Sequence, residues 1–214
     1  DIDSLQFTET DIIRDKYWIT YSAMNYRKEI HIIAQIIDDL LDEYPEMKYV
    51  VAGKDIEILY DNRFMRASSF FDIHIKRNKD RFLFLGEISD RERLFSIVKN
   101  AYACILPTRV DNLPNTCLES MALGKIVIST TCERGTSVEQ LIVDGDTGLL
   151  AQVDNAKSLY NKIVQAMNMS NEERKSMEEN AKNRVKNLTP ENVYVEMMKV
   201  YSKLLTKGKR RKRL

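Results

Sequence analysis

The chain has 214 residues, enough for one sizeable hydrophobic core, so we expect a single domain with short appendages. Its 33 lysines and arginines balance 32 acidic residues, and the resulting net charge of +1 argues against nucleic acid as a partner. The three cysteines show no C-x-x-C spacing, which argues against a zinc cluster and a disulfide framework and favours a reducing cytoplasm.

Strand-like and helix-like segments alternate as far as residue 150. A β-rich run at 17–21 precedes apolar residues at helical spacing from Ile30 to Leu41, and this pair predicts one strand followed by one amphipathic helix. The next predicted elements are strand 48–53, a helix-like stretch within 55–67, strand 81–86, helix 90–100, strand 101–106, a helix from Asn115, strand 125–130 and a weaker strand at 147–150. The stretch 68–80 fits a short strand, a packed loop or the end of the preceding helix.

The predicted strands are almost wholly apolar, as in ACIL and KIVIS. Such strands are typical of a parallel sheet that helices cover on both faces, whereas a sheet with one wet face would alternate polar and apolar residues. The sequence therefore predicts an α/β fold: a doubly wound, Rossmann-like parallel sheet of about six strands with extra C-terminal helices.

The last part of the chain is helical only, with helices predicted at 154–168, 170–188 and 190–205. Ser170 and Glu173 form a capping box, and Thr189 precedes a proline at the first helical position. The apolar residues of helix 190–205 cover more of its circumference than one face needs, so a partner surface should cover them. The six cations in 207–213 favour a solvated basic tail, and contact with anionic lipid is the alternative.

The predicted topology indicates where a ligand binds. With strand order 3-2-1-4-5-6, the chain leaves strands 1 and 4 in opposite directions, and a crevice opens at their carboxyl ends. The loops at 23–28 and 107–115 border this crevice. Pro114 suits the first helical turn after the second loop, which leaves the backbone N–H groups of Asn115 and Thr116 free to bind an anion such as a phosphate.

Two carboxylates accompany this phosphate site. Glu119 lies one turn after Asn115 on the same helical face, and its carboxylate would repel a diphosphate but accept hydrogen bonds from a diol such as a ribose. Asp111, in the loop before the helix, would take hydroxyls at the other end of the ligand. A diol beside a diphosphate describes a nucleotide sugar.

These residues form a longer pattern, VDNLPNTCLESMALGKIVIST followed by EQLIVDGDTGLL. The pattern resembles the E-x7-E donor-binding signature and the later E-x-I-x-D-G-x-x-G-x-L run of retaining GT-B glycosyltransferases of the glycosyl transferases group 1 type. GT-B enzymes close two Rossmann-like domains over a sugar donor. The resemblance covers residues 17 to 205 and corresponds to the family's C-terminal, donor-binding domain.

The resemblance implies a role for each matching residue, with Asp111 and Glu119 as the catalytic-site acids. Glu119 would bind the ribose hydroxyls, and Asp111 would bind the donor sugar. The remaining donor-binding positions that it implies are Lys28 and the backbone of Asn115 and Thr116 at the diphosphate, Asn112, Leu113 and Pro114 on the sugar side, and Gly86 and Ile88 against the base. The family's arginine is Ala23 here, and Asp111, one methylene shorter, replaces its first glutamate.

The resemblance thus predicts a donor-binding domain that transfers a sugar from a UDP- or GDP-sugar, without metal or cofactor, in bacterial surface polysaccharide or glycolipid synthesis. The alternatives are a nucleotide-sugar-binding subunit without activity of its own and a GT-B epimerase or phosphorylase.

The expected partners are a nucleotide sugar, an N-terminal acceptor-binding domain absent from this chain, and a second copy through the last helix. The expected location is the cytoplasm, with the inner face of the membrane as an alternative. The expected layout is 1–15 linker or domain start, 16–188 nucleotide-sugar-binding domain, 189–206 last helix and 207–214 basic tail.

Overall fold

The computed structural model describes residues 16–131 and 138–211, with side chains through residue 205. One six-stranded parallel sheet has the order β5-β2-β1-β6-β7-β8. Its strands are β1 (Tyr17–Tyr21), β2 (Lys48–Ala52), β5 (Phe82–Gly86), β6 (Ala103–Ile105), β7 (Val127–Thr130) and β8 (Leu149–Ala151). Counted along the chain, this is the predicted order 3-2-1-4-5-6. The doubly wound α/β fold is therefore confirmed, with its switch point between β1 and β6.

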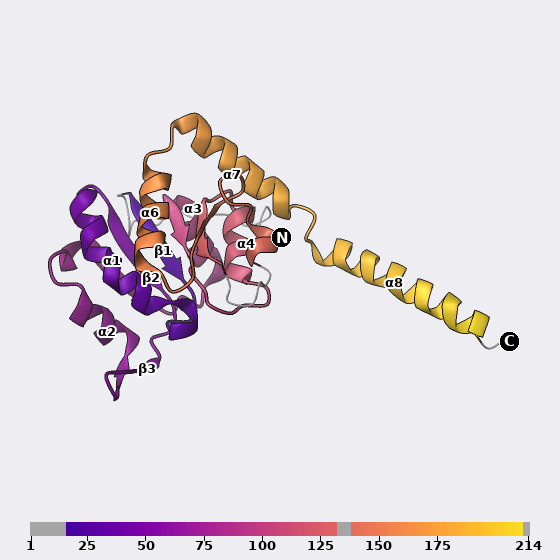
Figure 1. Cartoon of the computed structure of the whole chain (residues 1–214), viewed down its shortest axis with the longest axis horizontal. Helices are drawn as coiled ribbons and strands as arrows, with labels where there is room; N and C mark the ends of the chain where they lie inside the picture. Colours follow the sequence, from indigo (N-terminus) through magenta and orange to yellow (C-terminus); the bar gives the residue numbers. More distant parts are fainter. Residues whose placement is uncertain (1–15, 132–137, 212–214) are drawn as a thin grey trace.

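Helices cover both faces of the sheet (Figure 1). One face carries α1 (Ile30–Glu43), α2 (Ala67–His74) and α6 (Ala156–Met167), and the other carries α3 (Arg91–Asn100), α4 (Asn115–Ala122), α5 (Val138–Leu141) and α7 (Asn171–Val185). Short 3-10 helices are η2 (Tyr26–Lys28) and η3 (Lys79–Arg81). Neighbouring strand residues enter different cores: Trp18 packs with α1, and Ile19 packs against the opposite helices. This alternation explains why the strands are apolar throughout.

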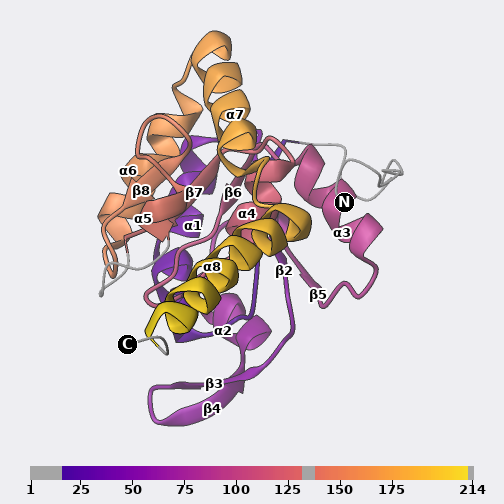
Figure 2. The ribbon, with the colours of Figure 1, turned by 90° about the vertical axis from the view of Figure 1, so that its right-hand side faces the viewer.

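The predicted helix-like stretch within 55–67 is wrong. It forms an antiparallel hairpin of β3 (Glu57–Tyr60) and β4 (Arg63–Arg66), which projects from the body below α2 (Figure 2). Asp61 and Asn62 form the two-residue turn with φ of 48° and 58°, a left-handed conformation that Asp and Asn tolerate well. Helix α2 then occupies the first part of the stretch 68–80, which the sequence left unassigned.

The C-terminal helices begin where the capping residues predict. In α7, the Ser170 hydroxyl accepts from the Glu173 N–H, and the Glu173 carboxylate accepts from the Ser170 N–H. The last helix, α8 (Pro190–Arg211), leaves the body as a separate rod (Figure 1). It extends past the expected end at 205, so the backbone of the basic segment is helical as far as Arg211. No helix within 16–131 and 138–211 is long and apolar enough to span a bilayer. Predictions for 1–15 and 212–214 fall outside the described residues.

Candidate functional site

The start of α4 faces the switch-point crevice and has free backbone donors. Helix α4 begins at Asn115, as predicted, but Pro114 is its N-cap residue and not part of its first turn, because its ψ of 99° is extended. The N–H groups of Cys117 and Leu118 bond back to the Pro114 carbonyl. Among the described residues, no group accepts a hydrogen bond from the N–H of Asn115 or Thr116. The helix start therefore offers the two donors that an anion would bind.

Tyr21, the last residue of β1, holds this helix start in place. Its hydroxyl donates to the Thr116 carbonyl oxygen at 2.7 Å and lies 2.8 Å from the Ser120 hydroxyl. Burial raises the pKa of Tyr21 well above its usual value, so this hydroxyl keeps its proton and remains a donor. The free end of α4 is thus tied to the carboxyl end of the central strand.

A pocket of about 330 Å³ opens beside this helix start. Its walls come from the ends of β1 and β2, the loops after β1, β2 and β5, one residue of α3, and the first two turns of α4. The lining residues are Tyr21, Ser22, Ala23, Ala52, Gly53, Lys54, Glu87, Ile88, Leu94, Thr116 and Glu119. Three predicted site residues, Ile88, Thr116 and Glu119, therefore meet in one cavity at the predicted edge of the sheet.

Glu119 has a partly buried carboxylate with one charged partner. Its side chain is 22% exposed, and the Arg91 guanidinium donates to Oε1 through Nη2 at 2.9 Å. Burial raises the pKa of Glu119, and the nearby charge and hydrogen bond of Arg91 oppose this rise. A carboxylate held in this way at the wall of a pocket can accept hydrogen bonds from hydroxyl groups of a ligand.

Lys28 and Asp111 also lie close together, although the sequence assigned them to different parts of a ligand. The Lys28 ammonium group donates to Asp111 Oδ2, and the two side chains are 11% and 17% exposed. Asn25 caps η2 by accepting from the Lys28 N–H, which positions the lysine. Burial raises the pKa of the Cys117 thiol to about 12, and the charges of Lys28 and Asp111 both act on it, so the pair lies beside the first turn of α4.

A buried glutamate joins the loops around this ion pair. Glu29 is fully buried with φ of 49°, a left-handed conformation. Its Oε2 lies 2.8 Å from the Thr130 hydroxyl at the end of β7, and its Oε1 accepts from the Asp154 N–H at 2.6 Å in the loop after β8. The Arg27 carbonyl accepts from the Arg109 N–H at 2.9 Å, which joins the loops after β1 and β6. The residues on both sides of Lys28 are therefore bonded to other segments: Arg27 to the loop after β6, and Glu29 to the end of β7 and the loop after β8.

The other predicted positions lie at the rim or outside the pocket. Asn112 and Leu113 are exposed, and Gly86 ends β5 with φ of 68° without lining the pocket. Ala23, where the family has an arginine, lines the pocket without adding a charge. Arg27 is exposed, and no bond of its side chain is found within the described residues.

Sequence reasoning missed Gly53, Lys54 and Glu87 in the pocket wall. Gly53 follows β2 directly, and its N–H donates to the Gly86 carbonyl at 2.8 Å. A Cβ atom on Gly53 would clash with the Ser22 carbonyl oxygen, so only glycine fits between these loops. The signal was available, because a glycine at the carboxyl end of a strand next to the switch point often marks close backbone approach.

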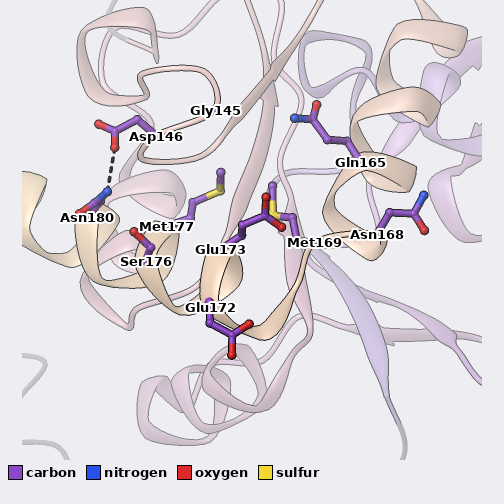
Figure 3. A pocket seen from close by; sticks show the side chains of 10 residues that line it. All are labelled: Gly145, Asp146, Gln165, Asn168, Met169, Glu172, Glu173, Ser176, Met177 and Asn180. Carbon is purple, nitrogen blue, oxygen red and sulfur yellow. Dashed lines mark hydrogen bonds between the residues drawn. The ribbon is translucent and has the colours of Figure 1, made fainter.

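A larger pocket, of about 660 Å³, lies between α6 and α7 and beside the loop that precedes β8 (Figure 3). That loop leads to the amino end of β8, at the edge of the sheet opposite the crevice. Polar side chains that line this larger pocket have local structural roles: Glu173 caps α7, and Asp146 accepts a hydrogen bond from Asn180 at 2.7 Å. It contains none of the predicted site residues, so the smaller pocket is the functional candidate.

Comparison with known proteins agrees with this geometry. The family model described as "Glycosyl transferases group 1" matches residues 5–184. An uncharacterized glycosyltransferase of Methanocaldococcus jannaschii is 28% identical over 169 residues, which cover 78% of this chain and 44% of that protein.

Two solved structures share the fold. The C-terminal domain of a glycosyl transferase group 1 family protein from Francisella tularensis aligns with a TM-score of 0.71 and 18% identity, covering 87% of this chain and 96% of that one. Anabaena HepE in complex with UDP aligns with a TM-score of 0.73 and 16% identity, covering 88% of this chain and 49% of that one. The chain thus spans about half the length of HepE and of the archaeal relative. Because the family model matches most of its length, the chain belongs to the glycosyl transferases group 1 family.

Proposed function

We propose that this chain is the donor-binding half of a retaining GT-B glycosyltransferase, which transfers a sugar from a nucleotide-diphosphate sugar to an acceptor. The observation that carries the proposal is the pocket in which Glu119 and Ile88 lie beside the free N-terminus of α4. This arrangement places a diol acceptor, an apolar surface and an anion site within one ligand's length. HepE, which shares the fold, was solved with UDP.

Each part of the donor has a matching group. The base would pack against Ile88, with Gly86 shaping the loop before it, and the ribose hydroxyls would donate to Glu119. The diphosphate would accept from the Asn115 and Thr116 N–H groups and from Lys28, and Asp111 would bind hydroxyls of the sugar. Asn112, Leu113 and Pro114 would border the sugar.

These donors also suit the chemistry of sugar transfer. The bond between the anomeric carbon and the diphosphate oxygen breaks, and the leaving diphosphate keeps the electron pair and gains negative charge. Fixed N–H groups at a helix start and the Lys28 ammonium would stabilise this charge as it develops. The acceptor hydroxyl oxygen then bonds to the anomeric carbon, and its proton passes to the leaving diphosphate.

The other half of the enzyme would bind the acceptor. The chain spans about half the length of the relatives described above, and α8 projects from the body with exposed apolar residues (Figure 1). We propose that an N-terminal domain packs on this helix in the whole protein, that the isolated chain is inactive, and that the enzyme acts in the cytoplasm or at the inner face of the membrane. Surface polysaccharide or glycolipid synthesis is the proposed setting.

Calorimetry of the chain with UDP-, GDP- and ADP-sugars tests the proposal. We expect weak binding, with Kd of roughly tens of micromolar to millimolar, because only one wall of the cleft is present. Ligand-observed NMR extends the test to the weakest ligands. Absence of binding for all three nucleotides at about millimolar concentration would refute the donor-binding function.

A further inference from the structure

Arg91, which no part of the donor assignment uses, contacts Glu119, the carboxylate assigned to the ribose. It is the first residue of α3, directly after Asp90, whose side chain caps the helix by accepting from the N–H groups of Glu92 and Arg93. Its Nη2 donates to Glu119 Oε1 at 2.9 Å from a helix that follows Glu87 and Ile88, two residues of the pocket wall. The contact therefore joins the two sides of the pocket.

Local energetics do not account for an arginine at this position. A cation in the first turn of a helix faces the positive end of the helix dipole, which is unfavourable. The Arg91 side chain is 70% exposed, and ion pairs of such exposed groups contribute little to stability. The Arg91 side chain nevertheless has a defined position over the Phe95 ring, one turn further along α3, where its guanidinium carbon lies 5.0 Å from the ring centre.

The helical face that carries Arg91 looks into the pocket. Leu94, three residues after Arg91 and so on the same face of α3, lines the pocket together with Glu119. Arg91 uses one oxygen of Glu119, and no side chain of the described residues is recorded on the other oxygen, Oε2. A ribose diol in the pocket would find a carboxylate whose orientation is set and whose second oxygen is open.

We propose that Arg91 is a positioning residue for Glu119 and makes nucleotide binding depend on the 2′-hydroxyl of the ribose. This inference rests on the proposed donor-binding function. Arg91 holds the Glu119 carboxylate in its ionised form and in one orientation, so a nucleotide with both ribose hydroxyls binds more tightly when Arg91 is present. A 2′-deoxynucleotide lacks one of the two hydroxyls, so Arg91 increases its affinity less.

The test compares Arg91→Met with Arg93→Met. Both changes remove one cation from the first turn of α3 and keep an unbranched apolar chain, but the Arg93 side chain is exposed and has no hydrogen bond or ion pair with the part of the chain that the structure describes. Calorimetry measures Kd for UDP, GDP and ADP and for the 2′-deoxy form of whichever binds best. Thermal unfolding of both variants monitors stability.

We expect Arg91→Met to weaken ribonucleotide binding by roughly three- to tenfold, a loss typical of one charge-assisted hydrogen bond acting through a neighbour. Binding of the 2′-deoxy form should change by less than about twofold, and Arg93→Met should leave both constants unchanged. The loss should be larger at low pH than at neutral pH, because removing Arg91 lets burial raise the pKa of Glu119 further.

Four outcomes would overturn the inference. An equal loss for the ribo and deoxy forms would show that Arg91 acts on the phosphates or on the overall field. Tighter binding by Arg91→Met would show that the arginine blocks the pocket. Unchanged binding by Arg91→Met would show that the ion pair of Arg91 with Glu119 has no role in binding. In that case nucleotide binding by the wild type would still support the proposed function. If wild type binds no nucleotide, the proposed function and this inference both fail.

Discussion

The ammonium group of Lys28 and the carboxylate of Asp111, 83 residues apart in the chain, form a largely buried ion pair beside the first turn of α4. The proposed ligand has a phosphate for the lysine and hydroxyls for the aspartate. On donor binding, Lys28 would contact the phosphate and Asp111 the hydroxyls. These contacts would either replace the ion pair or form in addition to it. The pair keeps both side chains near the helix start before a ligand arrives.

Replacing Lys28 by methionine should weaken binding of a nucleoside diphosphate by about 1.5–3 kcal/mol, the usual range for a hydrogen bond to a charged group. Binding of the nucleoside alone should not change, because it carries no phosphate. Calorimetry with both ligands measures the difference, and Lys175→Met, on the exposed side of α7, is the matched control.

The double variant Lys28→Met with Asp111→Asn separates binding from stability. Lys28→Met alone leaves the Asp111 carboxylate without its lysine, which should lower the free energy of unfolding, and the second change should restore part of that loss. Diphosphate binding should stay weak in the double variant. Recovery of binding together with stability would assign Lys28 a purely structural role.

Glu119→Ala should weaken nucleotide binding by about 1–3 kcal/mol with little loss of stability, because its carboxylate reaches the pocket and its one partner among the described residues, Arg91, is exposed. Calorimetry gives the binding constant, and circular dichroism melts give the stability. Unfolding of the variant with unchanged binding per folded molecule would make Glu119 a structural residue and remove it from the donor site.

Glu29→Gln should become more stable relative to wild type as pH rises. Burial raises the pKa of Glu29 in the folded state, opposed by the hydrogen bonds from Thr130 and the Asp154 N–H and by His31, while the Asp154 charge adds to the rise. A carboxyl group whose pKa is higher in the folded state than in the unfolded state stabilises the fold. This stabilisation is complete below the unfolded-state pKa of about 4.3, and it is lost as pH rises through the folded-state pKa. Glutamine does not titrate, so the difference in unfolding free energy should grow over that window, by about 1.4 kcal/mol per unit of pKa difference.

Urea unfolding at about pH 4 and about pH 7 measures this difference. Glu57→Gln, at an exposed carboxyl in the hairpin, controls for the general loss of a negative charge. A difference between Glu29→Gln and wild type that is the same at both pH values would contradict the raised pKa. Glutamine also preserves the geometry, since it can donate to the Thr130 hydroxyl and accept from the Asp154 N–H.

The isolated chain should self-associate through α8 at high concentration. Residues Val193, Val195, Met197, Met198, Val200, Tyr201, Leu204 and Leu205 are between 43% and 69% exposed. They lie along a helix that stands away from the body (Figure 1). Some of them, with Leu188, line a groove of about 470 Å³. An apolar strip of this kind is uncommon on a soluble monomer and tends to mark an interface.

Met198→Glu together with Leu205→Glu should make the chain monomeric in sedimentation experiments. Lys199→Gln with Lys203→Gln lowers the net charge by the same two units on the polar side of α8 and should leave association unchanged. A wild-type chain that stays monomeric near millimolar concentration, with α8 protected from hydrogen exchange, would show that the helix packs on its own domain.

The sequence alone determined the sheet, its strand order and the helix that carries the site. Strands such as ACIL and KIVIS are apolar on both sides, and only a sheet covered on both faces buries such strands completely. Local rules also placed the starts of α4 and α7, because Pro114, Ser170 and Glu173 act within one helical turn of their own positions. Local patterning failed in the segment 55–67, where the Asp61-Asn62 turn and pairing between β3 and β4 overrode a helix-like pattern.

The tertiary structure decided which side chains meet. The contacts of Lys28 with Asp111, of Arg91 with Glu119 and of Glu29 with Thr130 and Asp154 each join segments that are distant in the sequence. Sequence spacing predicts neighbours only within one helix or strand, whereas these contacts depend on how several strand ends converge at one edge of the sheet. The fit of Gly53 against Ser22 has the same origin, since only the packed loops show that a side chain has no room there.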